Sequence, residues 1–352
     1  MNESSPANCS CPENILDTWS SLLEKYIIPT LGCLGLLSNL TAILVLRCRE
    51  LKSTFHQSLL TLAICDIFLL IFIMGEILID VQNVIYIYIF PYFWNPLKNI
   101  VMSWETFLIM SIATERFLVV CRPLLYRRHR LRCSSLIHLL TFILPGLLCA
   151  IIINVPKFFE VEHVFYEDKV DFKATALRMD EDYIYFYTHW TRLLATGIVP
   201  FLYLVFTNTI IIIQIRRGEA LSDILRQNTN KSLQLKTPKP MKPQRLKFSN
   251  HSAVTLTMIV LIYMMCNLPR LVLNLVEYTL LSEMYKLDDC GCLLVHWWIS
   301  SMIRISHFLL AINSSVNFLI YFLSSKPFKK LLEIKIQNIL YKWFGIRIKF
   351  GN

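Results

Sequence analysis

Residues 26–46 read YIIPTLGCLGLLSNLTAILVL, a run of 21 residues without a charged side chain. An α-helix rises about 1.5 Å per residue, so about 20 apolar residues span the hydrocarbon core of a bilayer. Two further runs carry one carboxylate each, Asp66 in 58–75 and Glu105 in 99–114. Four more are uncharged: 133–155, 193–215, 248–269 and 305–325. The sequence therefore predicts an all-α membrane protein with a seven-transmembrane helix bundle.

The distribution of charge predicts the orientation of this bundle. The formal net charge of +10 alone would suggest a nucleic-acid partner. Six Lys and Arg residues lie in one set of alternate connecting segments: 1–25, 80–95, 157–182 and 277–289. The other set holds 24: 47–52, 122–132, 216–247 and 326–352. Basic loops stay in the cytoplasm. We expect a multi-pass plasma-membrane protein with an extracellular N-terminus, a cytoplasmic C-terminus and no nucleic-acid partner.

The same pattern divides the chain into an extracellular N-terminus (1–25), a seven-transmembrane domain (26–325) and a cytoplasmic tail (326–352). The inner segment 216–247 is polar, basic and proline-rich near its end, which predicts flexibility. After residue 326, apolar residues recur at helical spacing opposite lysines. This pattern predicts a short amphipathic eighth helix on the inner lipid leaflet, or alternatively one packed on another protein.

Two features of the outer segments indicate covalent modification. Asn2 and Asn8 each begin an Asn-x-Ser triplet, which is an acceptor site for N-linked glycans. Four cysteines lie on the oxidising outer side: Cys9, Cys11, Cys290 and Cys292. They can form bridges between the N-terminus and the last outer loop, although free or intermolecular thiols are equally compatible with the sequence.

Other classes of membrane protein are disfavoured. The eight histidines are scattered without metal-ligand spacing, and no glycine-rich phosphate loop is present, so we expect neither an enzyme nor a metal site. No internal repeat is visible, which argues against a seven-span transporter, although that class remains an alternative.

Polar residues within the spans are the candidate functional residues, because such groups are costly in lipid. Glu115-Arg116-Phe117 ends the third span, and Asp66 lies within the second. Pro269 lies in the sixth span, where a proline frees a carbonyl and creates a hinge. In the seventh, Asn313, Asn317 and Tyr321 are four residues apart and share one helix face.

In this order and spacing, the motifs resemble those of class A, rhodopsin-like G-protein-coupled receptors over nearly the whole chain. Within that family, Asn154-Val155-Pro156-Lys157-Phe158-Phe159-Glu160 and Cys266-Asn267-Leu268-Pro269 are similar to invertebrate FMRFamide-type neuropeptide receptors. The remaining matches to the family are Asn39, Asp66, Glu115, Arg116, Phe117, Pro200, Asn317, Tyr321 and Phe328.

The resemblance implies a signalling mechanism. Glu115 holds Arg116 in the resting receptor. When helix six swings outward about Pro269, Arg116 faces a heterotrimeric G protein. Phe117, Asn317 and Tyr321 belong to the same machinery.

The resemblance also implies a buried sodium site, formed by Asp66, Asn313, Ser314 and Asn317. Glu105 stands eleven residues before Arg116, where the family usually has serine. Two close carboxylates cannot both stay ionised in low dielectric without a cation. Either a sodium ion binds more firmly here, or one acid is protonated; we expect the sodium ion as the only candidate cofactor.

Several positions depart from the family pattern. Pro91 replaces the helix-three cysteine, Asn208 the helix-five tyrosine, Asn267 the helix-six tryptophan and Phe318 the helix-seven proline. The usual disulfide to the second outer loop is therefore absent, since no cysteine lies between residues 149 and 266.

The acidic outer segments favour a basic ligand, and the resemblance implies that this ligand is an amidated, FMRFamide-like neuropeptide. Lys98 replaces the aspartate of monoamine receptors, so an amine ligand would have no counter-ion. A small carboxylate or lipid read by Lys98 is the alternative, and Lys98 can also simply neutralise Glu76. Carboxylates at outer helix ends and nearby aromatic residues complete the candidate ligand site: Glu76, Asp80, Trp94, Lys98, Glu277, Trp298 and His307.

Overall fold

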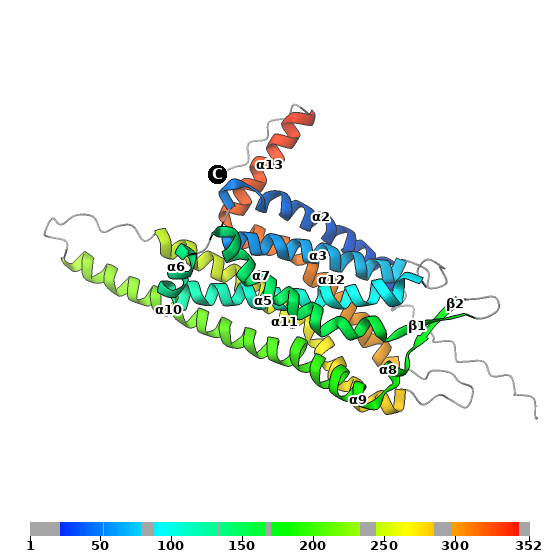
Figure 1. The fold of residues 1–352 in the computed structure, drawn as a ribbon. Coiled ribbons are helices and arrows are strands. Elements are labelled where there is room, and N and C mark those ends of the chain that lie inside the picture. The colour runs from blue at the N-terminus through cyan, green and yellow to red at the C-terminus, as the bar shows by residue number, and fades with distance from the viewer. Residues whose placement is uncertain are drawn as a thin grey trace, which may run out of the picture.

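The protein is represented by a computed structural model that describes residues 22–51, 53–78, 88–132, 134–165, 170–232, 244–284 and 297–344. Seven long helices run side by side in one bundle (Figure 1). They are α2 (Ile28–Leu46), α3 (Thr54–Leu78), α5 (Asn95–Cys121), α7 (Ser135–Asn154), α10 (Val199–Ser232), α11 (Gln244–Met284) and α12 (Trp297–Ser324). The predicted seven-helix bundle is confirmed.

Short helical segments extend or connect these helices. Four π-helical segments precede long helices: η1 (Leu23–Ile27) before α2, η3 (Phe90–Trp94) before α5, and η5 (Ile184–Thr191) with η6 (Leu193–Ile198) before α10. The others are η2 (Arg49–Leu51), α6 (Pro123–Arg132), η4 (Val155–Phe159), α8 (Ala176–Met179) and α9 (Glu181–Tyr183).

Helix α5 carries charged side chains along its length and lies at the centre of the bundle. Six stretches, one around each of the other long helices, are long and apolar enough to cross a membrane by composition alone. In contrast, α5 carries four charged residues: Lys98, Glu105, Glu115 and Arg116. It contacts α3, α7, α10 and α11, so its polar side chains face other helices rather than lipid. This position explains how a polar helix can span the bilayer.

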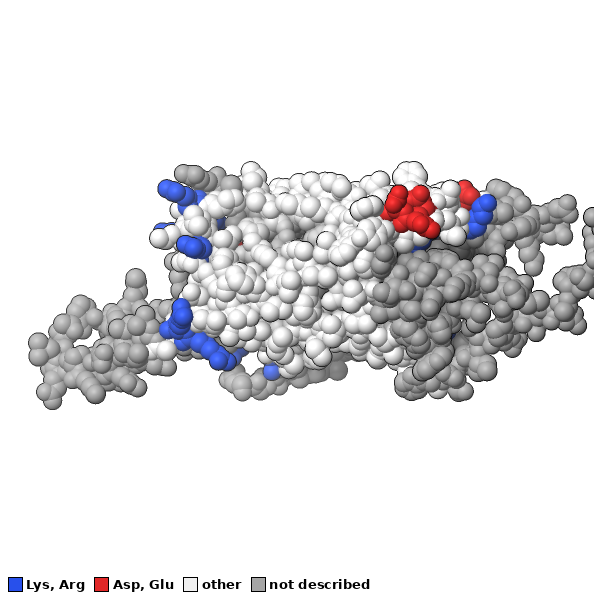
Figure 2. Space-filling model, turned by 90° about the horizontal axis from the view of Figure 1, so that it is seen from below, with Lys and Arg blue, Asp and Glu red and all other residues white. Residues whose placement is uncertain are grey.

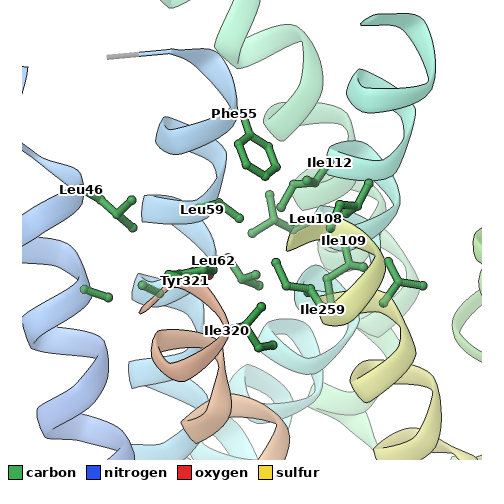
Figure 3. Close-up of a cluster of buried hydrophobic side chains, with 14 of the residues drawn as sticks. Leu46, Phe55, Leu59, Leu62, Leu108, Ile109, Ile112, Ile259, Ile320 and Tyr321 are labelled. Carbon is green, nitrogen blue, oxygen red and sulfur yellow. The ribbon is translucent and has the colours of Figure 1, made fainter. Parts of the chain in front are cut away.

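The main apolar core lies toward the end of the bundle where α13 (Lys326–Phe344) begins, which we call the α13 end. Figure 3 shows Leu46, Leu62, Ile112, Ile259 and Ile320 converging there from five helices. Phe328 and Leu332 of α13 join the same cluster. The predicted eighth helix is thus present and packs its first turns against the bundle.

The outside of the bundle is apolar between two charged ends. Leu34, Leu37, Phe206, Met265 and Leu323 are all more than half exposed. On the face shown in Figure 2, most of the visible Lys and Arg atoms lie at the α13 end, Asp and Glu lie with some Lys or Arg atoms at the opposite end, and the described surface between them is almost free of charged groups. An uncharged band of this kind is what a bilayer requires of a multi-pass protein.

The second outer segment, expected to be a loop, contains a β-hairpin. Strands β1 (Val161–Phe165) and β2 (Val170–Ala174) pair antiparallel, with Val161 opposite Ala174 and Phe165 opposite Val170. The rings of Tyr88 and Tyr92 each lie 5.0 Å from the His163 ring, which holds β1 beside η3. We call this end of the molecule the hairpin end.

The inner segment 216–247 is partly helical. Helix α10 continues to Ser232 and α11 begins at Gln244, while residues 233–243 lie outside the described part of the chain. Figure 1 shows both helices extending beyond the bundle at the α13 end.

Candidate functional site

A cavity of about 420 Å³ opens at the hairpin end between α3, α5, α11, α12 and the segment from η4 to α8. Its volume lies within the range typical of small-ligand pockets. Apolar side chains, including Ile73, Met102 and Leu310, form part of the wall. The charged side chains of the wall are Lys98, Lys157, Glu160, Arg178, Arg192 and Arg270.

The residues predicted to bind a ligand are only partly brought together. Lys98 and His307 line the cavity. Glu76 is not among the lining residues; its carboxylate forms an ion pair with the Lys98 ammonium. Trp94 packs against Gly75 and meets the edge of the Phe72 ring at 5.2 Å between centroids, so it fixes η3 against α3.

Other predicted residues are described incompletely. Glu277 lies in α11 and Trp298 in α12, but their side chains are outside the described part of the structure, as is all of Asp80. The glycan sites Asn2 and Asn8 also lie outside it, as do the cysteines Cys9, Cys11, Cys290 and Cys292.

The second outer segment is held by Glu160, a residue that sequence analysis did not assign to the site. Lys157 Nζ lies 2.7 Å from Glu160 Oε1, and Arg178 Nη1 lies 3.3 Å from Oε2. The Tyr183 hydroxyl donates a hydrogen bond of 2.8 Å to Oε1. Glu160 is only 3% exposed, and burial alone would raise its pKa, but the charges of Lys157 and Arg178 hold the pKa below its ordinary value.

Backbone contacts complete this attachment. Thr175 N donates to Glu160 O at 3.0 Å, and the Thr175 hydroxyl donates to Phe159 O at 2.7 Å. The Tyr187 hydroxyl donates to Ile153 O at 2.7 Å. This network ties the hairpin to the end of α7 in a segment that contains no cysteine. The Lys-x-x-Glu spacing at 157–160, which is helical spacing, was the signal available in the sequence.

A smaller cavity of about 40 Å³ lies next to the first, and Arg192, Arg270 and Asn274 line both. In its wall, the hydroxyls of Thr106 and Tyr263 are hydrogen-bonded at 2.7 Å and join α5 to α11. Asn267, which replaces the family's tryptophan, donates to Tyr263 O at 3.0 Å in its own helix.

The residues of the predicted sodium site form a buried polar cluster between α3, α5 and α12. Asn317 Nδ2 donates to Asp66 Oδ2 at 2.7 Å, and Asn313 Nδ2 donates to Glu105 Oε1 at 2.5 Å. The two carboxylates are close enough for their charges to interact. Asn39 Nδ2, from α2, donates to the Ser314 carbonyl at 2.7 Å.

The donor set of this cluster fits a sodium ion. Asp66 Oδ1 and the Ser314 hydroxyl are buried and have no hydrogen-bond partner among the described residues. Carboxylate and hydroxyl oxygens are the ligands that hard cations prefer. By contrast, the described residues contain no group of three or more His, Cys, Asp and Glu that could hold a metal ion.

At the α13 end, Arg116 is buried beside Glu115. Arg116 Nη2 lies 3.3 Å from Glu115 Oε1, and the Tyr126 hydroxyl of α6 donates to the same oxygen at 3.1 Å. The Arg116 guanidinium also lies 4.2 Å from the centroid of the Phe55 ring. Phe117 packs against the main core. Arg116 is thus held by a carboxylate of its own helix and a ring of α3.

The seventh helix passes through its atypical motif without a break. Phe318 occupies the position of the family's proline, and α12 is continuous from Trp297 to Ser324. The Phe318 ring contacts those of Phe322 and Phe328 at 6.4 and 5.8 Å between centroids. Tyr321 is 1% exposed and packs its ring 5.8 Å from Phe328. Aromatic packing therefore occupies the space around the motif.

Helix α11 links the two ends of the bundle. Pro269 lies inside it, next to Arg270 of the cavity wall. Toward the α13 end, the hydroxyls of Thr255 and Ser324 are hydrogen-bonded at 2.8 Å and join α11 to α12. An outward movement of this part of α11 requires that hydrogen bond to break.

Two known proteins have sequences similar to that of this chain. The chain is similar to the FMRFamide receptor of Drosophila melanogaster, with 26% identity over 343 residues that cover 90% of the chain and 55% of that receptor. It thus spans about half the length of that relative. It is also similar to the probable G-protein coupled receptor frpr-1 of Caenorhabditis elegans, with 22% identity over 342 residues, 89% of the chain and 79% of the relative.

The family model of the seven-transmembrane receptors of the rhodopsin family matches residues 38–321. The matched region runs from the residue before Asn39 to Tyr321 and includes the buried cluster, Arg116 and Pro269. The chain therefore belongs to the rhodopsin family of seven-transmembrane receptors.

Proposed function

We propose that this protein is a plasma-membrane receptor for an extracellular amidated neuropeptide of the FMRFamide type and couples to a heterotrimeric G protein. The observation that carries the proposal is the placement of two sites at opposite ends of one bundle. The cavity lies at the hairpin end and the buried Arg116 at the α13 end. Helices α5 and α11 run between them, and the name of the Drosophila melanogaster relative supplies the class of ligand.

The hairpin end is extracellular in this proposal and the α13 end cytoplasmic. The basic segments cluster at the α13 end, as cytoplasmic loops do. The amphipathic helix α13 then lies along the inner leaflet, where Lys329 and Lys330 are exposed to anionic lipid headgroups.

The mechanism is a shift between two arrangements of α11. The resting arrangement keeps the Thr255–Ser324 hydrogen bond and the Glu115–Arg116 ion pair. A peptide that binds better when the bundle is open at the α13 end shifts the equilibrium toward that form. A G protein that binds the open form does the same, so each partner raises the affinity of the other.

Pro269 supplies the hinge for this movement, because it removes one backbone hydrogen bond of α11. Asn317 and Tyr321 lie on the face of α12 that meets α3 and α13, where the open form rearranges the packing. A sodium ion bound by Asp66, Glu105, Asn313, Ser314 and Asn317 would offset the charge of the two carboxylates.

A screen tests the proposal. Cells expressing the protein are exposed to a library of amidated peptides, and calcium and cAMP are recorded. At least one peptide should evoke a response in the wild type that Arg116→Ala removes at equal surface expression. A response of the same size in both would contradict the proposal.

A further inference from the structure

The cavity at the hairpin end has an excess of positive charge. Five cationic side chains line it, and Glu160 is the only carboxylate among the described residues of its wall. The five cations are contributed by four parts of the chain, which are α5, the segment from η4 to α8, the junction of η5 with η6, and α11. This surplus bears directly on which chemical group a ligand can place there.

Carboxylates near the cavity neutralise only part of this charge. Glu76 pairs with Lys98, and Glu160 is shared by Lys157 and Arg178. Glu105, deeper in the bundle, interacts electrostatically with Arg270. These three carboxylates thus interact with four of the five cations, and Arg192 is the cation with which none of them pairs in the described part of the chain.

Arg192 is the cation of the cavity wall that has no carboxylate partner among the described residues. Its Nη2 donates to the neutral Asn99 Oδ1 at 3.2 Å, and no described carboxylate forms an ion pair with it. Arg192 is half-buried and, with Arg270, lines both the large and the small cavity. The two arginines therefore line the same pair of adjoining cavities.

A guanidinium that is removed from water without an anion is costly, whereas a bidentate carboxylate satisfies both its charge and its geometry. A basic ligand side chain would add like charge to the same space. We propose that the cavity binds a carboxylate group of the ligand, held by Arg192 and Arg270. This inference rests on the proposed function, because it concerns the ligand cavity of the receptor.

The surroundings define the ligand further. Met102 and Leu273 line the wall beside the arginines, so the carboxylate is accompanied by an apolar or aromatic group. The basic residue of an amidated peptide then lies outside the cavity. There Asp180, Glu181 and Asp182 are exposed beside the hairpin.

A carboxylate can belong to an acidic peptide residue or to a free carboxylic acid, so the test uses one matched pair of probes for each source. The peptide pair is N-acetyl-Asp-Phe-amide and N-acetyl-Asn-Phe-amide, and the free-acid pair is octanoate and octanamide. Binding is measured as a rise in the melting temperature of the purified full-length receptor in lipid nanodiscs. The acid of at least one pair should stabilise the receptor, and its amide should not.

Three variants locate the binding. Arg192→Gln and Arg270→Gln should each weaken binding of the acid probe by about 10- to 100-fold, the usual cost of losing a charge-assisted hydrogen-bonding partner. Arg304→Gln is the matched control, because Arg304 of α12 pairs with Glu24 and does not line either cavity. Arg192→Lys serves as a second variant in case a glutamine variant fails to fold. It keeps the positive charge but loses the planar guanidinium that binds a carboxylate through two hydrogen bonds, so it should still weaken binding of the acid probe.

Equal stabilisation by acid and amide, or acid-selective binding that both glutamine variants leave intact, would overturn the inference. The experiments distinguish failure of the carboxylate site from failure of the proposed peptide-receptor function. Peptides that signal equally with Asp or Asn would refute the carboxylate site and leave a peptide receptor. Arginine-dependent binding of octanoate, with neither dipeptide bound, would support the site and count against a peptide ligand.

Discussion

The hydroxyls of Thr255 and Ser324 lie 2.8 Å apart and connect α11 to α12 at the α13 end of the bundle. In the proposed mechanism, the outward movement of α11 breaks this contact, so removing the contact should favour the open form. The net value of such a hydrogen bond is about 1 kcal/mol, or about a fivefold change in an equilibrium constant. Thr255→Val should therefore raise ligand-independent G-protein signalling by up to about fivefold.

Basal signalling is measured at matched surface expression, with Thr209→Val as the control. The Thr209 hydroxyl bonds only to Val205 O within its own helix, and the residue is exposed on α10. A basal level in Thr255→Val equal to that of this control would show that the contact does not restrain α11.

Glu115 should restrain Arg116 in the same way. Its carboxylate accepts from both Arg116 and Tyr126, so Glu115→Gln removes the charge that holds the guanidinium. We expect higher basal signalling in Glu115→Gln and a smaller rise in Tyr126→Phe, which removes an uncharged donor and leaves the charge of Glu115 in place. Basal signalling is measured as the rate at which each receptor variant, without a ligand, promotes nucleotide exchange on purified G protein. If basal signalling rose more in Tyr126→Phe than in Glu115→Gln, the charge of Glu115 would not be the main restraint on Arg116.

The paired carboxylates Asp66 and Glu105 predict stabilisation by sodium. A cation that binds only the folded receptor raises the free energy of unfolding, and the rise grows with the logarithm of one plus the ratio of its concentration to its dissociation constant. The melting temperature should rise more in sodium chloride than in potassium chloride at equal ionic strength, and Glu105→Ser should reduce this difference. Identical sodium and potassium curves for the wild type would exclude a selective site.

Glu160 predicts a pH dependence of stability. Its pKa in the folded protein lies below the ordinary value of about 4.3. The ionised form therefore stabilises the fold above that ordinary value, and this contribution is lost as pH falls through the lower folded pKa. Removing one partner of a buried ion pair costs about 3 kcal/mol, so Glu160→Gln should melt at a lower temperature at pH 7.

The melting temperature of Glu160→Gln should also fall less than that of the wild type on acidification below about pH 4.3. Glu162→Gln is the control, because Glu162 is exposed on β1 and pairs with Lys173 at 3.5 Å. Equal melting curves for the two variants would contradict the role of Glu160 in fixing the second outer segment.

The membrane-spanning helices could be predicted because lipid imposes a length and a composition on each of them. The cost of polar groups in lipid singled out the candidate residues, and the family resemblance implied how they group. In the structure, Asp66 and Glu105 lie in one cluster, and Arg116 lies beside Glu115. Helix α13 was likewise readable from its amphipathic spacing, and Phe328 packs where that spacing predicts.

The outer segments could not be predicted in the same way. The hairpin of β1 and β2 depends on tertiary contacts with Tyr88 and Tyr92, which local sequence does not reveal. The pairing of Lys98 with Glu76, weighed only as an alternative, is what the structure shows. The positive cavity arises because Lys157 and Arg178, from an outer segment that is acidic as a whole, converge with Arg192, which lies beside the fifth span.

The distance between α11 and α2 at the α13 end tests the central claim most directly. Spin labels at Val254→Cys and Leu44→Cys, both exposed, report this distance in receptor whose other exposed cysteines are serine. With an activating peptide and nucleotide-free G protein bound, the distance distribution should shift to longer values, and Arg116→Ala should abolish the shift. An unchanged distribution in the wild type with both partners bound would contradict the account.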